Sequence, residues 1–204
     1  MTAESRKEGK RSAQSAPGRP RDGRIDAAII ASTRELILET GYSALSLSAI
    51  AARAETTTAA IYRRWSGKAQ LVHEAVLYAD SIPTPDGSGD IHDEIRALVE
   101  TIRAIFDRPE VRLALPGLIA DTVADPELHT MMIARLAGNL TAFESRFGQE
   151  RRGDDYLPML AEVVAGTAIF RILIRRDAAL DETWVNELTE MITERWPLET
   201  REHP

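Results

Sequence analysis

Apolar residues recur at helical spacing through most of the chain, and the first such stretch runs from Asp22 to Thr40. Its apolar and small positions are Ile25, Ala28, Ile29, Ser32, Leu36 and Ile37. Residues three or four apart share one face of a helix, so this stretch predicts an amphipathic helix. Gly41 follows directly and is a typical helix end, because glycine accepts the left-handed backbone found there.

Three shorter helices are predicted next. Ser46 or Ser48 can cap a helix that carries Ile50, Ala51 and Ala54, because a hydroxyl oxygen there accepts a bond from a free amide of the first turn. Thr57 or Thr58 can likewise cap a third helix that runs through Tyr62 to about Trp65. After a break at Ser66-Gly67, a fourth helix is expected over 68–79, with Leu71, Ala75 and Val76 on one face.

Residues 81–90 contain two prolines and two glycines and read as a linker. Only helical patterns follow it. They predict a helix over 91–107, a helix broken by Pro109 and Pro116 up to 123, a helix opened by Asp125-Pro126 to about 147, a charged loop at 149–155, an apolar helix over 157–175, and a last helix from Asp181 through Trp196. The sequence therefore predicts an all-α fold of about nine helices: an N-terminal three-helix helix-turn-helix domain (22–80) and a larger C-terminal helical bundle (81–204).

Residues 46–65 have the layout of a helix-turn-helix. Alanines at 51, 52 and 54 allow two helices to cross closely, while Ile50 and Ile61 supply a small core, although any buried helical hairpin could share these features. The second helix of such a motif can enter the major groove. Hydroxyl groups suit phosphate oxygens and arginine suits phosphate or guanine, so the candidate DNA contacts here are Ser46, Ser48, Thr57, Thr58, Ala59, Tyr62, Arg63, Arg64 and Lys68. The alternative for Arg63 and Arg64 is an ordinary solvated helix end.

The distribution of charge agrees with this location. The chain has a net charge of −7, but residues 1–80 carry 12 Lys/Arg against 9 Asp/Glu, and the acidic excess lies entirely after them. Residues 1–21 are polar, basic and without apolar periodicity, which predicts a disordered arm. Arg19, Arg21 and Arg24 are then candidates for phosphate or minor-groove contacts, the alternative being a solvated tail with no role.

Residues 24–80 resemble the DNA-binding domain of the TetR family of bacterial transcriptional regulators. The resemblance rests on Gly41-Tyr42, the run LSLSAIAARA, the segment IYRRW and Gly67-Lys68. One departure is Glu55, which stands where the family usually has glycine. Because glycine there relieves a turn with positive φ, Glu55 is expected to be strained or to reshape the turn.

The segments ADPELHTMM and FRILIRRDAALDETWVNELTEMI resemble the family's ligand-binding and dimerisation domain. Residues 157–175 are apolar on nearly every side and so must be covered on more than one side, by the chain's own core or by a partner. The resemblance implies a homodimer in which the last two helices pair, with candidate contacts Met159, Val163, Ile174, Trp184, Leu188 and Met191. It also implies a small-molecule pocket among the middle helices, with candidates Leu98, Ile102, Phe106, Leu118, Thr122, Met132, Leu136, Leu140, Phe143, Phe170 and, as an anion partner, Arg171.

Other classes of function find little support. The chain has no cysteine, no apolar run of membrane-spanning length and no secretory h-region, so a cytoplasmic protein is expected. The cluster GDIHDE at 89–94 could suggest a metal, but acidic residues are usual at a helix start. We found no P-loop, dinucleotide fingerprint, HExxH pair or GxSxG elbow, and expect no enzyme, cofactor or metal site.

The resemblance implies a ligand-responsive repressor that binds a palindromic operator as a homodimer and is released by a small-molecule effector. Two alternatives stay open at the sequence level. One is an activator or nucleoid-type DNA-binding factor. The other is an all-α binding protein or enzyme that has no affinity for DNA.

Overall fold

The computed structural model describes residues 23–78, 91–135, 156–175 and 179–195, and every regular element within these ranges is helical. The elements are α1 (Gly23–Ala44), α2 (Leu47–Arg53), α3 (Thr58–Tyr62), α4 (Lys68–His73), the π-helical turn η1 (Glu74–Tyr78), α5 (Ile91–Phe106), α6 (Pro109–Ala124), α8 (Tyr156–Phe170), the π-helical turn η3 (Arg171–Arg175) and α9 (Glu182–Arg195). Residues 126–135 are helical as well. The predicted all-α class is confirmed. No helix in the described part of the chain is both long and apolar enough to cross a membrane.

Side chains that were predicted as caps do begin the helices. Of the two alternatives at each of the first two sites, Ser46 accepts a hydrogen bond from the amide of Ala49 at 3.2 Å, and Thr57 accepts one from the amide of Ala60 at 3.1 Å. Asp125 accepts from two amides of the next helix, at 2.9 and 3.1 Å. These bonds satisfy amides that have no partner inside the helix. Gly41 has the predicted positive φ, 75, but it kinks α1 instead of ending it, because the helix continues to Ala44.

The predicted break around Pro116 is wrong, because α6 is one continuous helix through that residue. Pro109 lies in its first turn, where no amide donor is needed. Pro116 sits inside the helix on its exposed side, and the opposite face is buried through Val111, Ala114, Leu115 and Leu118. Tertiary packing of this face therefore outweighs the hydrogen bond that the proline removes.

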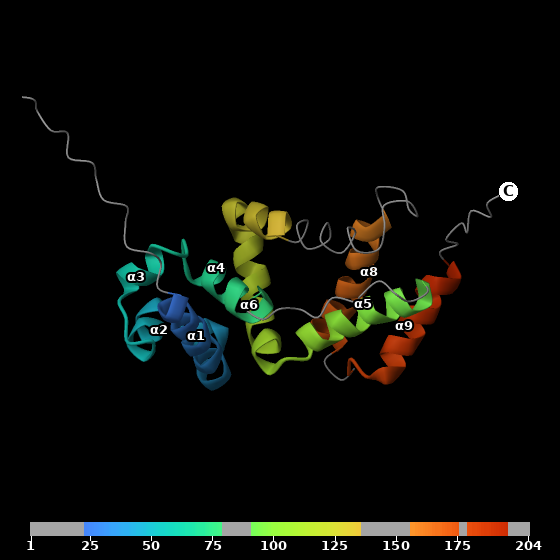
Figure 1. Ribbon diagram of the computed structural model, residues 1–204, viewed down its shortest axis with the longest axis horizontal. Coiled ribbons are helices and arrows are strands. Elements are labelled where there is room, and N and C mark those ends of the chain that lie inside the picture. Colours follow the sequence, from blue (N-terminus) through green and yellow to red (C-terminus); the bar gives the residue numbers. More distant parts are fainter. Residues whose placement is uncertain (1–22, 79–90, 136–155, 176–178, 196–204) are drawn as a thin grey trace, which may run out of the picture.

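The helices form two groups of contacts. Helices α1 to α4 gather at one end of the molecule, and α6 packs against α1 and α4 (Figure 1). At the other end α5 lies alongside α9 and also contacts α8 (Figure 1). We call α1 to α4 the head. It is tied to the rest of the described chain mainly through α6 and the turn after α4.

Candidate nucleic-acid interface

The inner side of the helix-turn-helix is a small, fully enclosed core. Ile50 and Ile61 are 0% exposed, and Ala51 and Ala60 are also buried. Trp65, just beyond α3, is buried at 3% exposure and extends this core. Of the predicted packing residues, Ile50, Ala51 and Ile61 are thus buried and Ala54 is partly buried, whereas Ala52 is exposed. The buried residues fix which side of α3 can face outward.

The outer side of α2 and α3 carries most of the candidate DNA contacts. Tyr62 is 60% exposed, so its phenol is accessible to a partner. The other exposed candidates on this side are Ser46, Ser48, Thr57, Thr58, Ala59 and Arg63. Hydroxyl, phenol and guanidinium groups therefore surround α3 on its solvent side, while its apolar side is held in the core.

Two predicted contacts are engaged elsewhere. The side chain of Arg64 is only 11% exposed, where its Nε binds the carboxylate of Asp26 and its Nη1 donates to the Ala60 carbonyl at 2.9 Å. The Nζ of Lys68 donates to the Tyr42 carbonyl at 3.3 Å and lies 4.3 Å from the centre of the Tyr42 ring. The expectation that Arg64 is presented to solvent beside Arg63 is therefore corrected. Arg24 is exposed at the start of α1, whereas Arg19 and Arg21 lie outside the described residues.

The turn between α2 and α3 contains the predicted strain. Glu55 has φ 49, the only positive φ among the described residues other than glycine. Its amide donates to the Ala52 carbonyl at 3.3 Å, and the amide of Thr56 donates to the Ala51 carbonyl at 2.9 Å. This pair of bonds is a Schellman motif, in which the left-handed position normally holds glycine. The turn therefore has the geometry expected with glycine, and the backbone of Glu55 is strained by its positive φ.

Replacing Glu55 by glycine is expected to stabilise the protein by about 1 kcal/mol, because the left-handed backbone costs a residue with a Cβ about that much. The comparison variant is Glu55→Ala, which removes the same charge but keeps the Cβ and the strain. Equilibrium denaturation of both variants measures the difference. Equal stability of the glycine and alanine variants would show that the backbone at this position is not strained.

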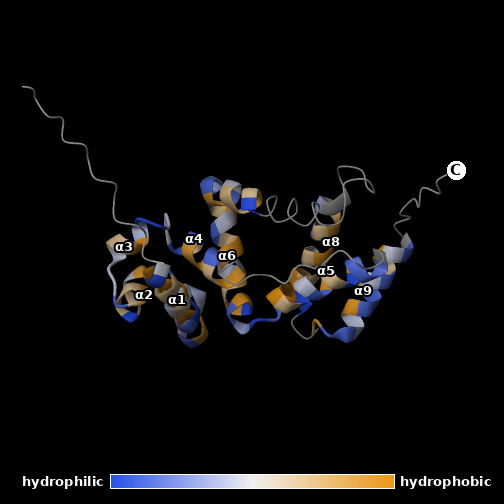
Figure 2. Cartoon of the chain, in the orientation of Figure 1, coloured by the Kyte–Doolittle hydropathy of each residue, from blue (hydrophilic) through white to orange (hydrophobic). Residues whose placement is uncertain are grey.

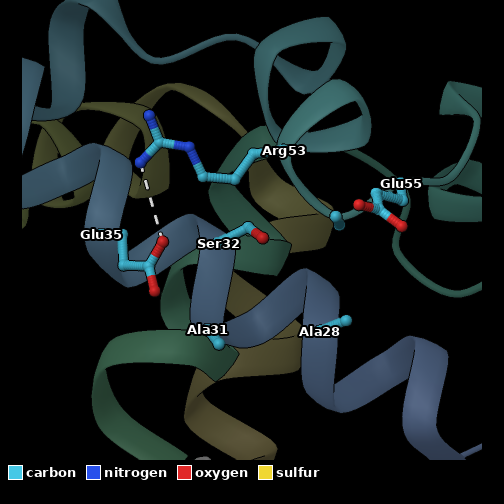
Figure 3. Close-up of a pocket in the computed structure, with 7 residues that line it drawn as sticks. Ala28, Ala31, Ser32, Glu35, Arg53 and Glu55 are labelled. Atoms are coloured by element: carbon cyan, nitrogen blue, oxygen red, sulfur yellow. Dashed lines mark ion pairs between the residues drawn. The ribbon is translucent and has the colours of Figure 1, made fainter.

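A shallow depression lies between α1 and the end of α2. It is lined by Ala28, Ala31, Ser32, Glu35, Arg53, Ala54 and Glu55 (Figure 3). Arg53 reaches across to α1 and binds both carboxylate oxygens of Glu39, at 2.5 and 2.7 Å, with Glu35 at 3.6 Å. The hydrogen bond from Arg53 lowers the pKa of Glu39. These paired charges tie α2 to α1, so the depression belongs to the packing of the head.

Comparison with known proteins agrees with this geometry. The family model described as bacterial regulatory proteins, tetR family, matches residues 29–75, which run from α1 into η1. A second model, described as tetracyclin repressor-like, C-terminal domain, matches residues 84–192. This chain belongs to the tetR family. The first match includes α2 and α3, the two helices of the predicted helix-turn-helix.

Individual relatives cover less of the chain. It is 34% identical over 97 residues to the uncharacterized HTH-type transcriptional regulator YdeS of Bacillus subtilis, covering 47% of this chain and 49% of YdeS. It is 36% identical over 75 residues to the uncharacterized HTH-type transcriptional regulator Rv1556 of Mycobacterium tuberculosis, covering 36% of this chain and 37% of the relative. The chain thus spans about half or less of the length of these curated relatives.

Two solved structures share the fold. NalD of Pseudomonas aeruginosa, the secondary repressor of the MexAB-OprM multidrug efflux pump, has a TM-score of 0.56 at 22% identity, covering 84% of this chain and 96% of NalD. Salmonella enterica GusR has a TM-score of 0.59 at 18% identity, covering 85% and 96%. At 22% and 18% identity, these similarities show that the fold is shared.

The head of this tetR-family protein meets α6 at a contact that the sequence did not predict. Tyr42, 6% exposed, donates its hydroxyl hydrogen bond to Asp121 of α6. Its ring lies so close to Gly117 that a Cβ there would be 2.2 Å from Tyr42 Cδ1. Burial, and then the bond to Asp121, raise the pKa of the Tyr42 phenol. The only available signal was a glycine inside a helical pattern, which often marks a close approach.

The turn η1, which ends the fourth helix, is held from two sides. The Nε of Arg34, on α1, donates to the Ala75 carbonyl at 2.6 Å. Arg108, just before α6, donates to the Val76 carbonyl. A π-helical turn departs from the regular hydrogen-bond pattern and is often found at functional sites. Here it joins the head to the α6 side of the molecule.

A partly buried polar cluster surrounds the same turn. Arg135 binds Glu74 at 2.8 Å and lies 5.5 Å from the centre of the Tyr78 ring. His73 is 1% exposed, with its ring centre 4.9 Å from that of Tyr78. Burial, and then the charge of Arg135, lower the pKa of His73 to about 4. The imidazole is therefore neutral near pH 7.

The predicted ligand-pocket residues fall on two packing units. Leu98, Ile102 and Phe106 lie on α5, which packs against α8 and α9, whereas Leu118 and Thr122 lie on α6, which packs against the head. Thr122 donates to the sulfur of Met132 at 2.9 Å. Phe170 is 54% exposed, and Arg171 donates to the Ala179 carbonyl at 2.8 Å. Leu136, Leu140 and Phe143 lie outside the described residues.

The predicted dimer residues also separate into two sets. Met159, Ile174 and Met191 are 50, 67 and 48% exposed, and Val163 is half-buried. Trp184 and Leu188, in contrast, are 4 and 5% exposed in the core of the chain itself. They are unavailable to a partner, and the expectation for these two residues is corrected. Phe170, predicted as a pocket residue, joins the exposed apolar set instead.

Proposed function

We propose that this tetR-family protein is a transcriptional repressor that binds a near-palindromic operator as a homodimer and releases it when a small molecule binds. The observation that carries the proposal is the two-sided α3. Its inner residues are 0–5% exposed, while Tyr62 and Arg63 stand outward on a surface with several hydroxyl groups. A helix anchored on one side and polar on the other can be presented to the major groove.

Replacing Arg63 by alanine is expected to weaken operator binding about tenfold and to reduce the dependence of log affinity on log salt by about one charge, because an arginine on phosphate releases one counterion. Fluorescence anisotropy with the DNA upstream of the protein's own gene, over a series of salt concentrations, measures both. The control is Arg112→Ala on α6, an arginine paired with Asp107. An Arg63 variant with unchanged affinity and slope would remove α3 from the interface.

The dimer part of the proposal is supported by α8. Met159, Val163, Gly166 and Phe170 follow each other at spacings of four, three and four residues, and so share one side of the helix. Met159 and Phe170 are half-exposed, and Gly166 has no side chain, so another helix can approach the middle of the stripe closely. Figure 2 shows that α8 is mostly apolar. A second copy of α8 is the partner that this stripe fits, because a two-fold axis brings the same stripe to both sides.

A dimer of this kind presents two heads to successive major grooves, about 34–36 Å apart. A small molecule bound among the middle helices would favour a different head spacing. DNA and effector would then each weaken the other's binding by the same factor. Because the Tyr42–Asp121 bond and η1 join the head to α6, we propose that they carry this coupling.

Selection of binding sites from random DNA separates the repressor from its alternatives. A single palindromic motif is expected. An activator would select such a motif too, but would raise transcription from a promoter placed next to it. A nucleoid-type factor would select DNA by shape alone, and a protein without DNA affinity would select nothing.

A further inference from the structure

Helix α3 is too short to hold its own orientation. It has only five residues, Thr58–Tyr62, and isolated helices below about 12 residues are marginal in water. Its direction relative to DNA must therefore come from tertiary contacts. Ala60 and Ile61 supply the apolar ones. Together with Trp65 just beyond the helix, they fix how deeply α3 is buried, and a polar contact at its end would restrain its rotation as well.

Such a polar contact is present at the end of α3. The guanidinium of Arg64 donates to the Ala60 carbonyl, one of those left without a partner where the helix ends. The same group binds Asp26 in the first turn of α1. The Arg64 side chain is largely shielded from water at 11% exposure, and the Asp26 side chain is 31% exposed. One planar group therefore joins the end of α3 to the start of α1.

We propose that Arg64 is a positioning residue for operator binding: held by Asp26 and the Ala60 carbonyl, it fixes the orientation of α3 and does not itself contact DNA. The inference rests on the operator binding proposed above. Its neighbour Arg63 is exposed and plays the opposite part. These two adjacent arginines thus have different roles, because the side chain of Arg63 lies on the exposed side of the motif and that of Arg64 on the side that faces α1.

The substitution Asp26→Ala tests the proposal by the sign of its effect. If Arg64 positions α3, losing Asp26 weakens operator binding about tenfold while leaving the salt slope unchanged. If Arg64 instead contacts phosphate, losing Asp26 releases the arginine and removes a negative charge, so binding strengthens and the slope rises. The control is Glu35→Ala, which removes a carboxylate from the exposed side of the same helix and leaves the closer Arg53–Glu39 pair in place. Strengthened binding by the Asp26 variant overturns the proposal.

Arg64→Ala completes the pair of variants. It is expected to lower operator affinity about tenfold, with affinity for unrelated DNA and the salt slope unchanged, because non-specific binding depends on phosphate contacts. Arg63→Ala, in contrast, is expected to lower both the affinity for unrelated DNA and the salt slope. A drop in the slope for Arg64→Ala, equal to that for Arg63→Ala, contradicts the proposal. All variants are compared below the lowest melting temperature among them, so that loss of folding is not mistaken for loss of positioning.

Hydrogen exchange without DNA gives an outcome that does not depend on the proposed function. Asp26→Ala is expected to speed exchange in peptides that span residues 58–65, and Glu35→Ala is not. Faster exchange in a protein that binds no operator would leave the positioning of α3 standing and refute the repressor. Unchanged exchange in the Asp26 variant would refute the positioning role even in a protein that binds its operator well.

Discussion

Replacing Ile174 with aspartate is expected to give a monomer and to lower operator affinity at least about a hundredfold. Ile174 is 67% exposed in η3, at the end of the apolar stripe of α8. An aspartate there would place two like charges near each other across a two-fold axis, without water to solvate them. Loss of the dimer then removes the gain of roughly 10²–10⁴ that two linked heads have over one.

The matched control is Val123→Asp. Val123 is 82% exposed on α6, so the same charge is added to an apolar residue away from α8. Light scattering at micromolar protein reports the mass, and anisotropy reports operator affinity. The Val123 variant is expected to remain a dimer with unchanged affinity. A dimeric Ile174 variant would mean that α8 does not form the interface.

The helix-turn-helix could be predicted from sequence because its signals are local. Ser46 and Thr57 lie within three residues of the amides they cap, and the small residue Ala51 is buried where two helices cross. The strain at Glu55 was predictable for the same reason, since the turn depends on one residue's backbone. Local signals of this kind need no knowledge of what lies across the fold.

The role of Arg64 could not be predicted, because its partner Asp26 is 38 residues away. An arginine at a helix end looks the same in sequence whether it faces DNA or a carboxylate. Trp184 and Leu188 illustrate the same limit. Their periodicity correctly predicted an apolar face on α9, but it contains no information on whether that face is covered by α5 of the same chain or by a second copy.

The contact between Gly117 and Tyr42 also joins residues far apart in the sequence, and a substitution at Gly117 is expected to have a large effect on stability. Gly117→Ala is expected to destabilise the protein by about 2–3 kcal/mol, the upper part of the usual overpacking cost of roughly 1–3 kcal/mol. The added methyl group would lie 2.2 Å from Tyr42 Cδ1 and 2.9 Å from Cγ, so the ring itself must move. The ring cannot turn aside cheaply, because Tyr42 is 6% exposed and its hydroxyl is bound to Asp121.

The direction of the stability change caused by Gly117→Ala distinguishes this packing contact from the ordinary effect of alanine in a helix. Alanine inside a helix is normally about 1 kcal/mol more favourable than glycine, so without the Tyr42 contact the same substitution would stabilise α6. Thermal unfolding should show a melting temperature lower by about 5–10 °C, given roughly 2–4 °C for each kcal/mol in a chain of this size. The control is Gly67→Ala, where a Cβ meets nothing within 4 Å and a smaller loss of about 0.5–1 kcal/mol is expected, because glycine is a better N-cap than alanine. A higher melting temperature for Gly117→Ala would mean that the head does not pack on α6 through Tyr42, and would remove that contact as a route between effector and DNA.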